Sequence, residues 1–107
     1  MSQENLKTIL SALRNRLKGF YGDRLLQALL YGSQARGEAA PGSDIDVMIV
    51  LKGPVRPGEE IAKTSELVAE LSLRWEVVIS CLFIDEDRFL HRNGPLLRNI
   101  RREGVEI

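Results

Sequence analysis

The chain has 107 residues, and its 15 Lys and Arg balance 15 Asp and Glu, so the formal net charge is zero. This length suits one domain with one core, and a composition of 44% hydrophobic and 28% charged residues is typical of globular proteins rather than disordered or fibrous ones. The balanced charge gives no sign of a nucleic-acid or membrane partner, and the single Cys81 excludes an internal disulfide framework or a multi-cysteine zinc site. We therefore expect one domain over residues 1–107, in a soluble cytoplasmic protein, with Cys81 buried as a small apolar residue.

The first predicted element is an amphipathic helix that Ser2 can cap. Its apolar residues recur at intervals of three and four: Leu6, Ile9, Leu10, Leu13 and Leu17. Charge mixed with leucine at helical spacing fits neither a signal peptide nor a transmembrane span. After Gly19 and Gly22, the short apolar run RLLQALLYG (24–32) predicts a buried strand.

The next segments alternate between polar turns and apolar runs. The insert GSQARG (32–37) leads to a turn at Pro41 and Gly42, and SDIDVMIVL (43–51), rich in Ile and Val, predicts a second strand. A loop with two prolines and two glycines (52–58) precedes a helix expected over 59–74.

The C-terminal part adds one strand and one helix. The segment WEVVISCLFI (75–84) predicts the third and longest strand, and a closing helix is expected to start near Asn93 and Pro95 and to end at Gly104. Helices that alternate with three or more strands in a chain of this size indicate an α/β or α+β fold, with a sheet covered by helices.

Two aspartates interrupt the start of the second strand. Alternation along a strand points Asp44 and Asp46 the same way and leaves Ile45, Val47 and Ile49 for the core. At about 3.3 Å per residue the two Cα atoms lie roughly 6.6 Å apart, so both carboxylates can converge on one cation. Magnesium favours one or two carboxylates together with phosphate oxygens and water. The alternative is a pair of solvated aspartates at an exposed strand end.

The preceding glycine insert makes a nucleotide the natural ligand of this pair. Gly32 directly follows a strand, and Ser33 to Arg36 can form a helical turn whose free N–H groups, with the Ser33 hydroxyl, would bind a phosphate. The alternative is ordinary Gly-Ser turn chemistry with Arg36 as a surface charge.

Three other motifs fail at specific residues. A Walker loop would need Lys and Ser or Thr where this chain has Glu38 and Ala39. An EF-hand loop starting at Asp44 would need glycine where the chain has Ile49. No Gly-x-Ser-x-Gly accompanies the only histidine, His91, which argues against a serine hydrolase. A phosphate cradle, a turn and a carboxylate pair remain, which is the pattern of a nucleotide–metal site.

The stretch GSQARGEAAPGSDIDVMIV (32–50) resembles the signature of nucleotidyltransferases of the DNA polymerase beta superfamily, and is most similar to the minimal nucleotidyltransferases found in HEPN/MNT toxin–antitoxin pairs. The resemblance covers the whole chain in order. It implies the polymerase beta-like fold, which is a small mixed sheet of three or more strands flanked by helices.

The resemblance also implies roles for the residues of the motif. Gly32, Ser33 and Ser43 would bind ATP or another nucleoside triphosphate, and Arg36 would support the phosphate side or the helix cap. Asp44 and Asp46 would bind two Mg²⁺ ions, which gives them the catalytic role.

The family further uses a third carboxylate on a later strand, for which this sequence offers Glu76. Asp85 and Asp87 lie too far along the predicted strand, and the alternative for Glu76 is a solvated residue at the strand start. With Glu76 as third metal ligand, the implied mechanism is two-metal phosphoryl transfer with release of pyrophosphate, in which Glu76 can also accept the proton of the attacking hydroxyl.

The implied activity is transfer of a nucleoside monophosphate, AMP from ATP, to a hydroxyl of a HEPN-family partner, with the protein acting as an antitoxin. The alternative is a non-catalytic HEPN-binding antitoxin or a nucleotide-sensing module. Nucleic acid is a weaker hypothesis, because Arg98, Arg101 and Arg102 fit a solvated helix face or a partner contact. The sequence leaves the oligomeric state open, a homo-oligomer included.

Overall fold

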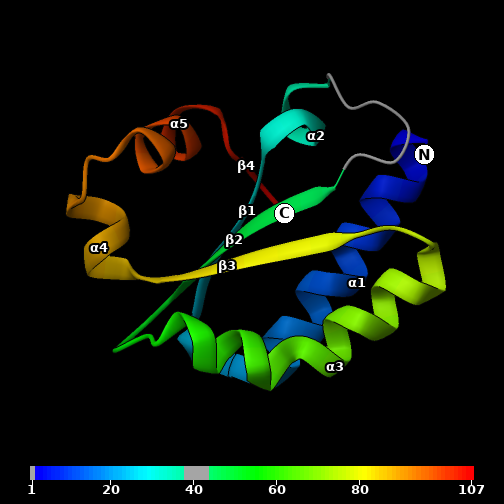
Figure 1. Ribbon diagram of the computed structural model, residues 1–107, viewed down its shortest axis with the longest axis horizontal. Coiled ribbons are helices and arrows are strands. Elements are labelled where there is room, and N and C mark those ends of the chain that lie inside the picture. Colours follow the sequence, from blue (N-terminus) through cyan, green and yellow to red (C-terminus); the bar gives the residue numbers. More distant parts are fainter. Residues whose placement is uncertain (1, 38–43) are drawn as a thin grey trace.

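The computed structural model describes residues 2–37 and 44–107 (Figure 1). Its elements, in chain order, are α1 (Gln3–Tyr21), the 3-10 helix η1 (Gly22–Arg24), β1 (Leu25–Tyr31), α2 (Gly32–Arg36), β2 (Ile45–Leu51), α3 (Pro57–Trp75), β3 (Ile79–Asp85), α4 (Glu86–His91), α5 (Pro95–Glu103) and β4 (Val105–Glu106). The strands form one sheet in the order β3-β2-β1-β4. Because β1 is antiparallel to β2 and β4 while β2 is parallel to β3, the sheet is mixed, as expected.

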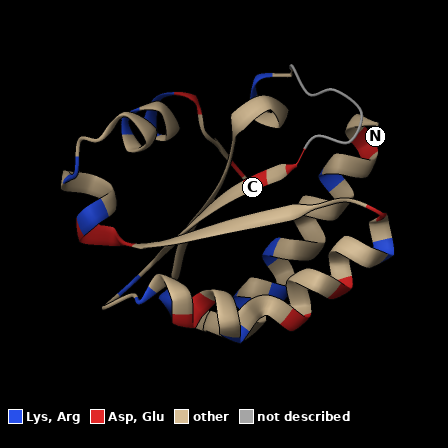
Figure 2. Cartoon of the chain, viewed as in Figure 1, with Lys and Arg blue, Asp and Glu red and all other residues tan. Residues whose placement is uncertain are grey.

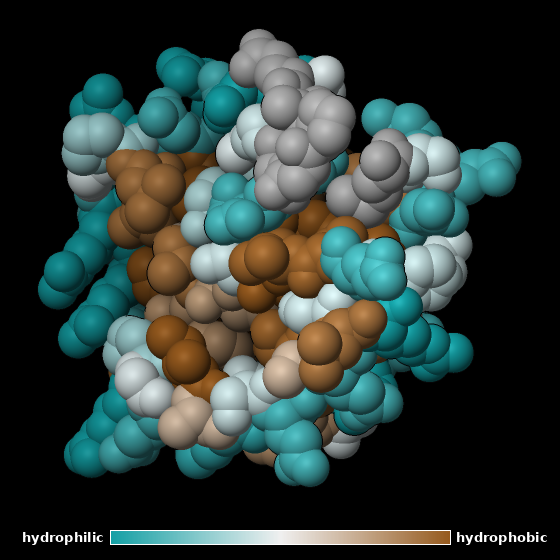
Figure 3. Space-filling view, turned by 45° about the vertical axis from the view of Figure 1, so that its right-hand side comes forward, coloured by the Kyte–Doolittle hydropathy of each residue, from teal (hydrophilic) through white to brown (hydrophobic). Residues whose placement is uncertain are grey.

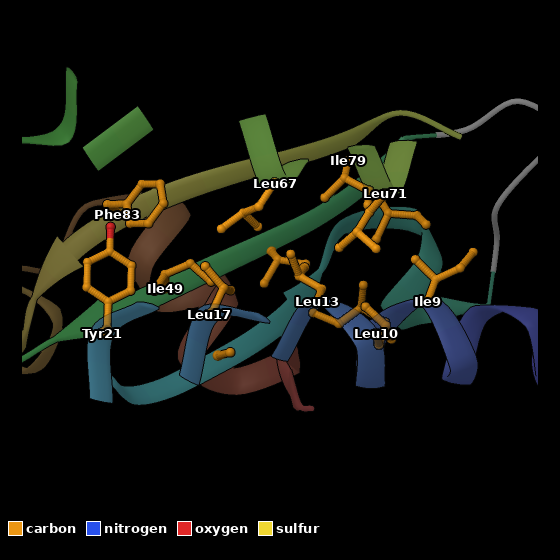
Figure 4. Close-up of a cluster of buried hydrophobic side chains, with 14 of the residues drawn as sticks. Ile9, Leu10, Leu13, Leu17, Tyr21, Ile49, Leu67, Leu71, Ile79 and Phe83 are labelled. Atoms are coloured by element: carbon orange, nitrogen blue, oxygen red, sulfur yellow. The ribbon is translucent and has the colours of Figure 1, made fainter. Parts of the chain in front are cut away.

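Helices α1 and α3 cover one face of the sheet, while the shorter α4 and α5 lie on the other (Figure 1). The main core lies under the two long helices (Figure 4). Ile45, Val47 and Ile49 of β2 are fully buried in it, which confirms the alternation predicted for this strand. The other face of β2 contributes Met48 and Val50 to a smaller cluster under α4 and α5.

A buried polar pair joins α1 to α3. The Tyr21 hydroxyl donates a hydrogen bond of 2.9 Å to Oε1 of Glu60, whose residue is only 3% exposed. The Thr64 hydroxyl in turn donates to the backbone carbonyl of Glu60 at 2.8 Å. Burying a polar group is costly unless it is hydrogen-bonded, so these bonds make the interface between the helices specific.

The predicted elements exist, but the start of the third strand was wrong. Helix α3 continues to Trp75, and Glu76 caps it in the left-handed conformation at φ 53°, so β3 starts only at Ile79. The sequence also missed α4, which Asp85 caps by accepting the Arg88 N–H at 3.0 Å, and the two-residue strand β4.

Cys81 packs against the main core and is half-buried, and burial raises the pKa of its thiol to about 12. This matches the expected role as a small apolar residue. In the described ranges, no helix combines the length and the apolar character needed to cross a membrane.

Candidate active site

Strand register brings three polar side chains together on the α4–α5 face of the sheet. Asp46 of β2 pairs with Tyr31 of β1 on one side and with Ser80 of β3 on the other. Directly paired residues of neighbouring strands point to the same face, so these three side chains lie in a row across the sheet. Figure 2 shows the acidic start of β2, in red, next to the end at which β1 runs into α2.

Gly32, the first residue of α2, lies against the carboxylate of Asp46. Gly32 has φ 75°, and a Cβ atom at this position would lie only 2.7 Å from Oδ2 of Asp46. Glycine is needed here twice, for its positive φ and for the space that the carboxylate takes. The two polar inserts of the sequence therefore meet in space.

The two aspartates form a poorly neutralised negative site. Burial, and then the charge of Asp44, raises the pKa of Asp46 above its ordinary value. Burial and the charge of Asp46 also raise the pKa of the Tyr31 phenol to about 12, so Tyr31 is neutral at physiological pH. Asp44 itself is exposed just before β2 begins. A cation bound between the two carboxylates would relieve their repulsion and offset the cost of burying Asp46.

The expected helical turn after β1 is present as α2. It ends at Gly37, which has φ 71° and donates its N–H to the Gln34 carbonyl. Ser33 is half-buried in the first turn. The exposed Arg36 lies 3.9 Å from Oε2 of Glu103, so this arginine links α2 to α5.

The remaining predicted site residues lie elsewhere. Glu76 is exposed at the end of α3, before β3 begins, and its role as third carboxylate stays a prediction. Ser43 falls outside the described residues. Over 2–37 and 44–107, no three His, Cys, Asp or Glu side chains gather into a group that could hold a metal ion. The donors that are in place, Asp44 and Asp46, have the hard carboxylate oxygens that Mg²⁺ prefers.

Two residues of this region, Tyr31 and Ser80, were not among the predicted site residues. Tyr31 is the residue before the glycine insert, and Ser80 is a polar residue within an apolar strand. Strand alternation alone could have placed each on a face, but only the register shows that both flank Asp46. A carboxylate pair at a strand start, held against a glycine-led turn, is the arrangement that the sequence predicted for a nucleotide–metal site.

The comparisons with known proteins narrow this prediction. The profile described as "Nucleotidyltransferase domain" matches residues 6–105. "Putative protein adenylyltransferase MJ1305" of Methanocaldococcus jannaschii is 30% identical over 102 residues, which are 94% of this chain and 69% of that protein. "Putative protein adenylyltransferase MJ0604" of the same organism is 35% identical over 91 residues, 84% of this chain and 85% of that protein.

Solved structures agree at the level of the fold. A toxin–antitoxin crystal structure with AMP-PNP matches with a TM-score of 0.60 and 18% identity, over 94% of this chain and 69% of that chain. A mutant of the toxin–antitoxin MntA-HpeT matches with a TM-score of 0.57 and 15% identity, over the same shares of 94% and 69%. The chain belongs to the nucleotidyltransferase domain family. This membership confirms the resemblance to nucleotidyltransferases seen in the sequence.

Proposed function

We propose that this nucleotidyltransferase, as a single domain over residues 1–107, uses Mg²⁺ to transfer AMP from ATP to a hydroxyl group of a HEPN-family protein, and that it acts as a cytoplasmic antitoxin. The observation that carries the proposal is the contact of Gly32 with Asp46, next to Asp44. It places a turn suited to phosphate beside a pair of carboxylates suited to a cation.

In this proposal the residues of the two inserts divide the work. Gly32 and Ser33 bind the triphosphate through backbone N–H groups and the Ser33 hydroxyl, and Ser43 and Arg36 support the nucleotide. Asp44 and Asp46 hold Mg²⁺, which when bound neutralises phosphate charge and assists loss of pyrophosphate. The acceptor oxygen attacks the α-phosphorus atom, the bond to the pyrophosphate oxygen breaks, and the acceptor loses its proton.

A protein acceptor is supported by the open surface beside the site. Tyr31, Leu82 and Ile84 are only partly buried, so the helices on this side leave part of the sheet uncovered. Apolar surface lies in the middle of the face shown in Figure 3, with polar side chains around it. The two archaeal relatives are named as protein adenylyltransferases, and both structural neighbours are toxin–antitoxin assemblies.

The test is label transfer from ATP. Purified protein with Mg²⁺ is incubated with a co-purified HEPN protein and ATP labelled at the α-phosphate, with ATP labelled at the γ-phosphate as a negative control. We expect label on the HEPN chain only from α-labelled ATP, and loss of labelling in an Asp44→Asn, Asp46→Asn double variant. The matched control is Asp87→Asn, because Asp87 is an exposed aspartate on α4, away from the site.

Cell protection then separates catalysis from simple binding. If the double variant neutralises the HEPN toxin as well as the wild type does, and no label is transferred, the protein is a non-catalytic antitoxin and the proposal of AMP transfer is wrong.

A further inference from the structure

The site has one position at which β3 can reach Asp46, and Ser80 occupies it. Parallel pairing places Ser80 directly beside Asp46, and the Ile45 N–H donates to the Val78 carbonyl at 2.8 Å at the start of the two strands. Neighbouring strands lie about 4.8 Å apart, so the side chain of Ser80 is next to the carboxylate. The next residues on either side with the same orientation are Val78, just before β3, and Leu82 within it, and both are apolar.

The opposite neighbour adds no negative charge either. On β1 the paired residue is Tyr31, whose side chain is a phenol and not a carboxylate. Glu76 is exposed beyond the start of β3, at the cap of α3. Among the described residues, the carboxylates that the protein offers at the site are therefore those of Asp44 and Asp46.

We infer that the site of this chain holds one divalent cation. Because position 80 of β3 carries a serine and not a carboxylate, a second cation has no carboxylate ligand from this strand. The inference rests on the proposed function, because it assumes that Asp44 and Asp46 bind a metal. Two divalent ions in one site repel four times as strongly as two unit charges at the same distance. The triphosphate offsets part of this repulsion, but we expect an ion held on the β3 side of the site to need carboxylate charge from that strand as well. A hydroxyl supplies none.

A substitution at Ser80 removes no hydrogen bond of the described structure. The Ser80 side chain is half-buried, and no hydrogen bond joins its hydroxyl to another residue of the described ranges. Ser80→Asp would therefore place a third carboxylate beside Asp46 without removing an existing bond. In the wild type, the Ser80 hydroxyl remains available to donate to Asp46 or to a bound phosphate.

The experiment counts ions with Mn²⁺ in place of Mg²⁺ and α,β-methylene-ATP as an unreactive nucleotide. Equilibrium dialysis is expected to give one Mn²⁺ per chain for the wild type and two for Ser80→Asp. Two ions in one site lie about 3.5–4 Å apart. The Ser80→Asp complex is therefore expected to show the dipolar Mn–Mn coupling in its electron paramagnetic resonance spectrum that the wild type lacks.

Two controls keep the count specific. Ser65→Asp adds the same carboxylate at an exposed position of α3, and should leave one ion. Glu76→Gln should also leave one ion. A wild-type count of two overturns the inference while leaving the proposed function intact, and a fall to one in Glu76→Gln would then identify Glu76 as the third ligand.

Other outcomes are equally decisive. A folded Ser80→Asp that still binds one ion overturns the inference, and circular dichroism establishes whether it is folded. If Ser80→Asp does not fold, the number of Mn²⁺ ions bound by the wild type still tests the inference, because one ion supports it and two overturn it. A wild-type count of zero instead contradicts the proposed function, since no metal then binds at Asp44 and Asp46.

Discussion

Replacing Gly32 with alanine tests the contact at the centre of the site. The new Cβ would lie 2.7 Å from Oδ2 of Asp46, about 0.7 Å short of the 3.4 Å at which ordinary van der Waals contact begins. The three heavy atoms nearest to that Cβ all belong to Asp46, so this carboxylate must move. We expect Gly32→Ala to displace Asp46, the proposed metal ligand, as well as to strain the backbone.

Gly37 offers a matched control for the strain. Its φ of 71° is close to the 75° of Gly32, but a Cβ there meets nothing within 4 Å. A left-handed alanine costs about 1–2 kcal/mol, so both variants should lose that much stability. Gly32→Ala should lose about 0.5–1.5 kcal/mol more, the cost of forcing a side chain off its rotamer.

The assays are thermal unfolding, Mn²⁺ affinity and label transfer from α-labelled ATP. For a domain of this size each kcal/mol corresponds to a Tm change of about 4–8 °C. Misplacement of a reacting group by about 1 Å can lower a rate by about 10²-fold, and we expect a loss of this order for Gly32→Ala alone. Equal Mn²⁺ affinity and equal transfer rates in Gly32→Ala and Gly37→Ala would refute the role assigned to the contact.

Three further predictions concern single side chains. Tyr21→Phe leaves the buried carboxylate of Glu60 without its donor, so urea denaturation should show a loss of about 1–3 kcal/mol; an unchanged midpoint would contradict this. The raised pKa of Asp46 means that the folded state binds this proton more tightly than the unfolded chain does, so ionised Asp46 destabilises the metal-free fold at neutral pH. Asp46→Asn should therefore raise Tm at pH 7 without metal, an advantage that disappears as the pH falls below the ordinary aspartate value of 3.8, and Mg²⁺ should stabilise only the wild type. Arg101 donates from Nη1 to the carbonyls of Phe89 at 2.5 Å and Arg92 at 2.9 Å, and from Nη2 to Oδ1 of Asn93 at 3.1 Å. The single nitrogen of lysine cannot reproduce this two-nitrogen arrangement. Arg101→Lys should lower the free energy of unfolding by about 1.5–3 kcal/mol and speed amide hydrogen exchange in α4. Unaltered exchange in α4 would contradict the role of these hydrogen bonds.

Local signals made the N-terminal half of the fold predictable. The stripe of α1 and its cap are both legible in the sequence, and Ser2 does accept the Asn5 N–H at 3.0 Å. The alternation of β2 predicted correctly which of its residues face the main core. In each case the pattern of residues a few positions apart determines the element, so long-range contacts did not change the predicted structure.

Less local features could not be predicted. The start of β3 was wrong because Trp75 and Glu76 are followed by β-branched residues, and the left-handed cap at Glu76 has no glycine to mark it. Helix α4 is short, although Asp85 followed by two acidic residues was a usable start signal. The closeness of Ser80 to Asp46 depends on the parallel register of β3, which α3 sets from a distance along the chain.

Strand β2 serves the fold and the site with alternate residues. Ile45, Val47 and Ile49 face the long helices, while Asp46 faces the neighbours Tyr31 and Ser80. A one-residue insertion or deletion within this strand would exchange the two sets, turning the carboxylate into the apolar layer and the core residues toward the site. The strand is thus far less tolerant of length changes than of conservative substitutions, and folding and ligand binding would be lost together.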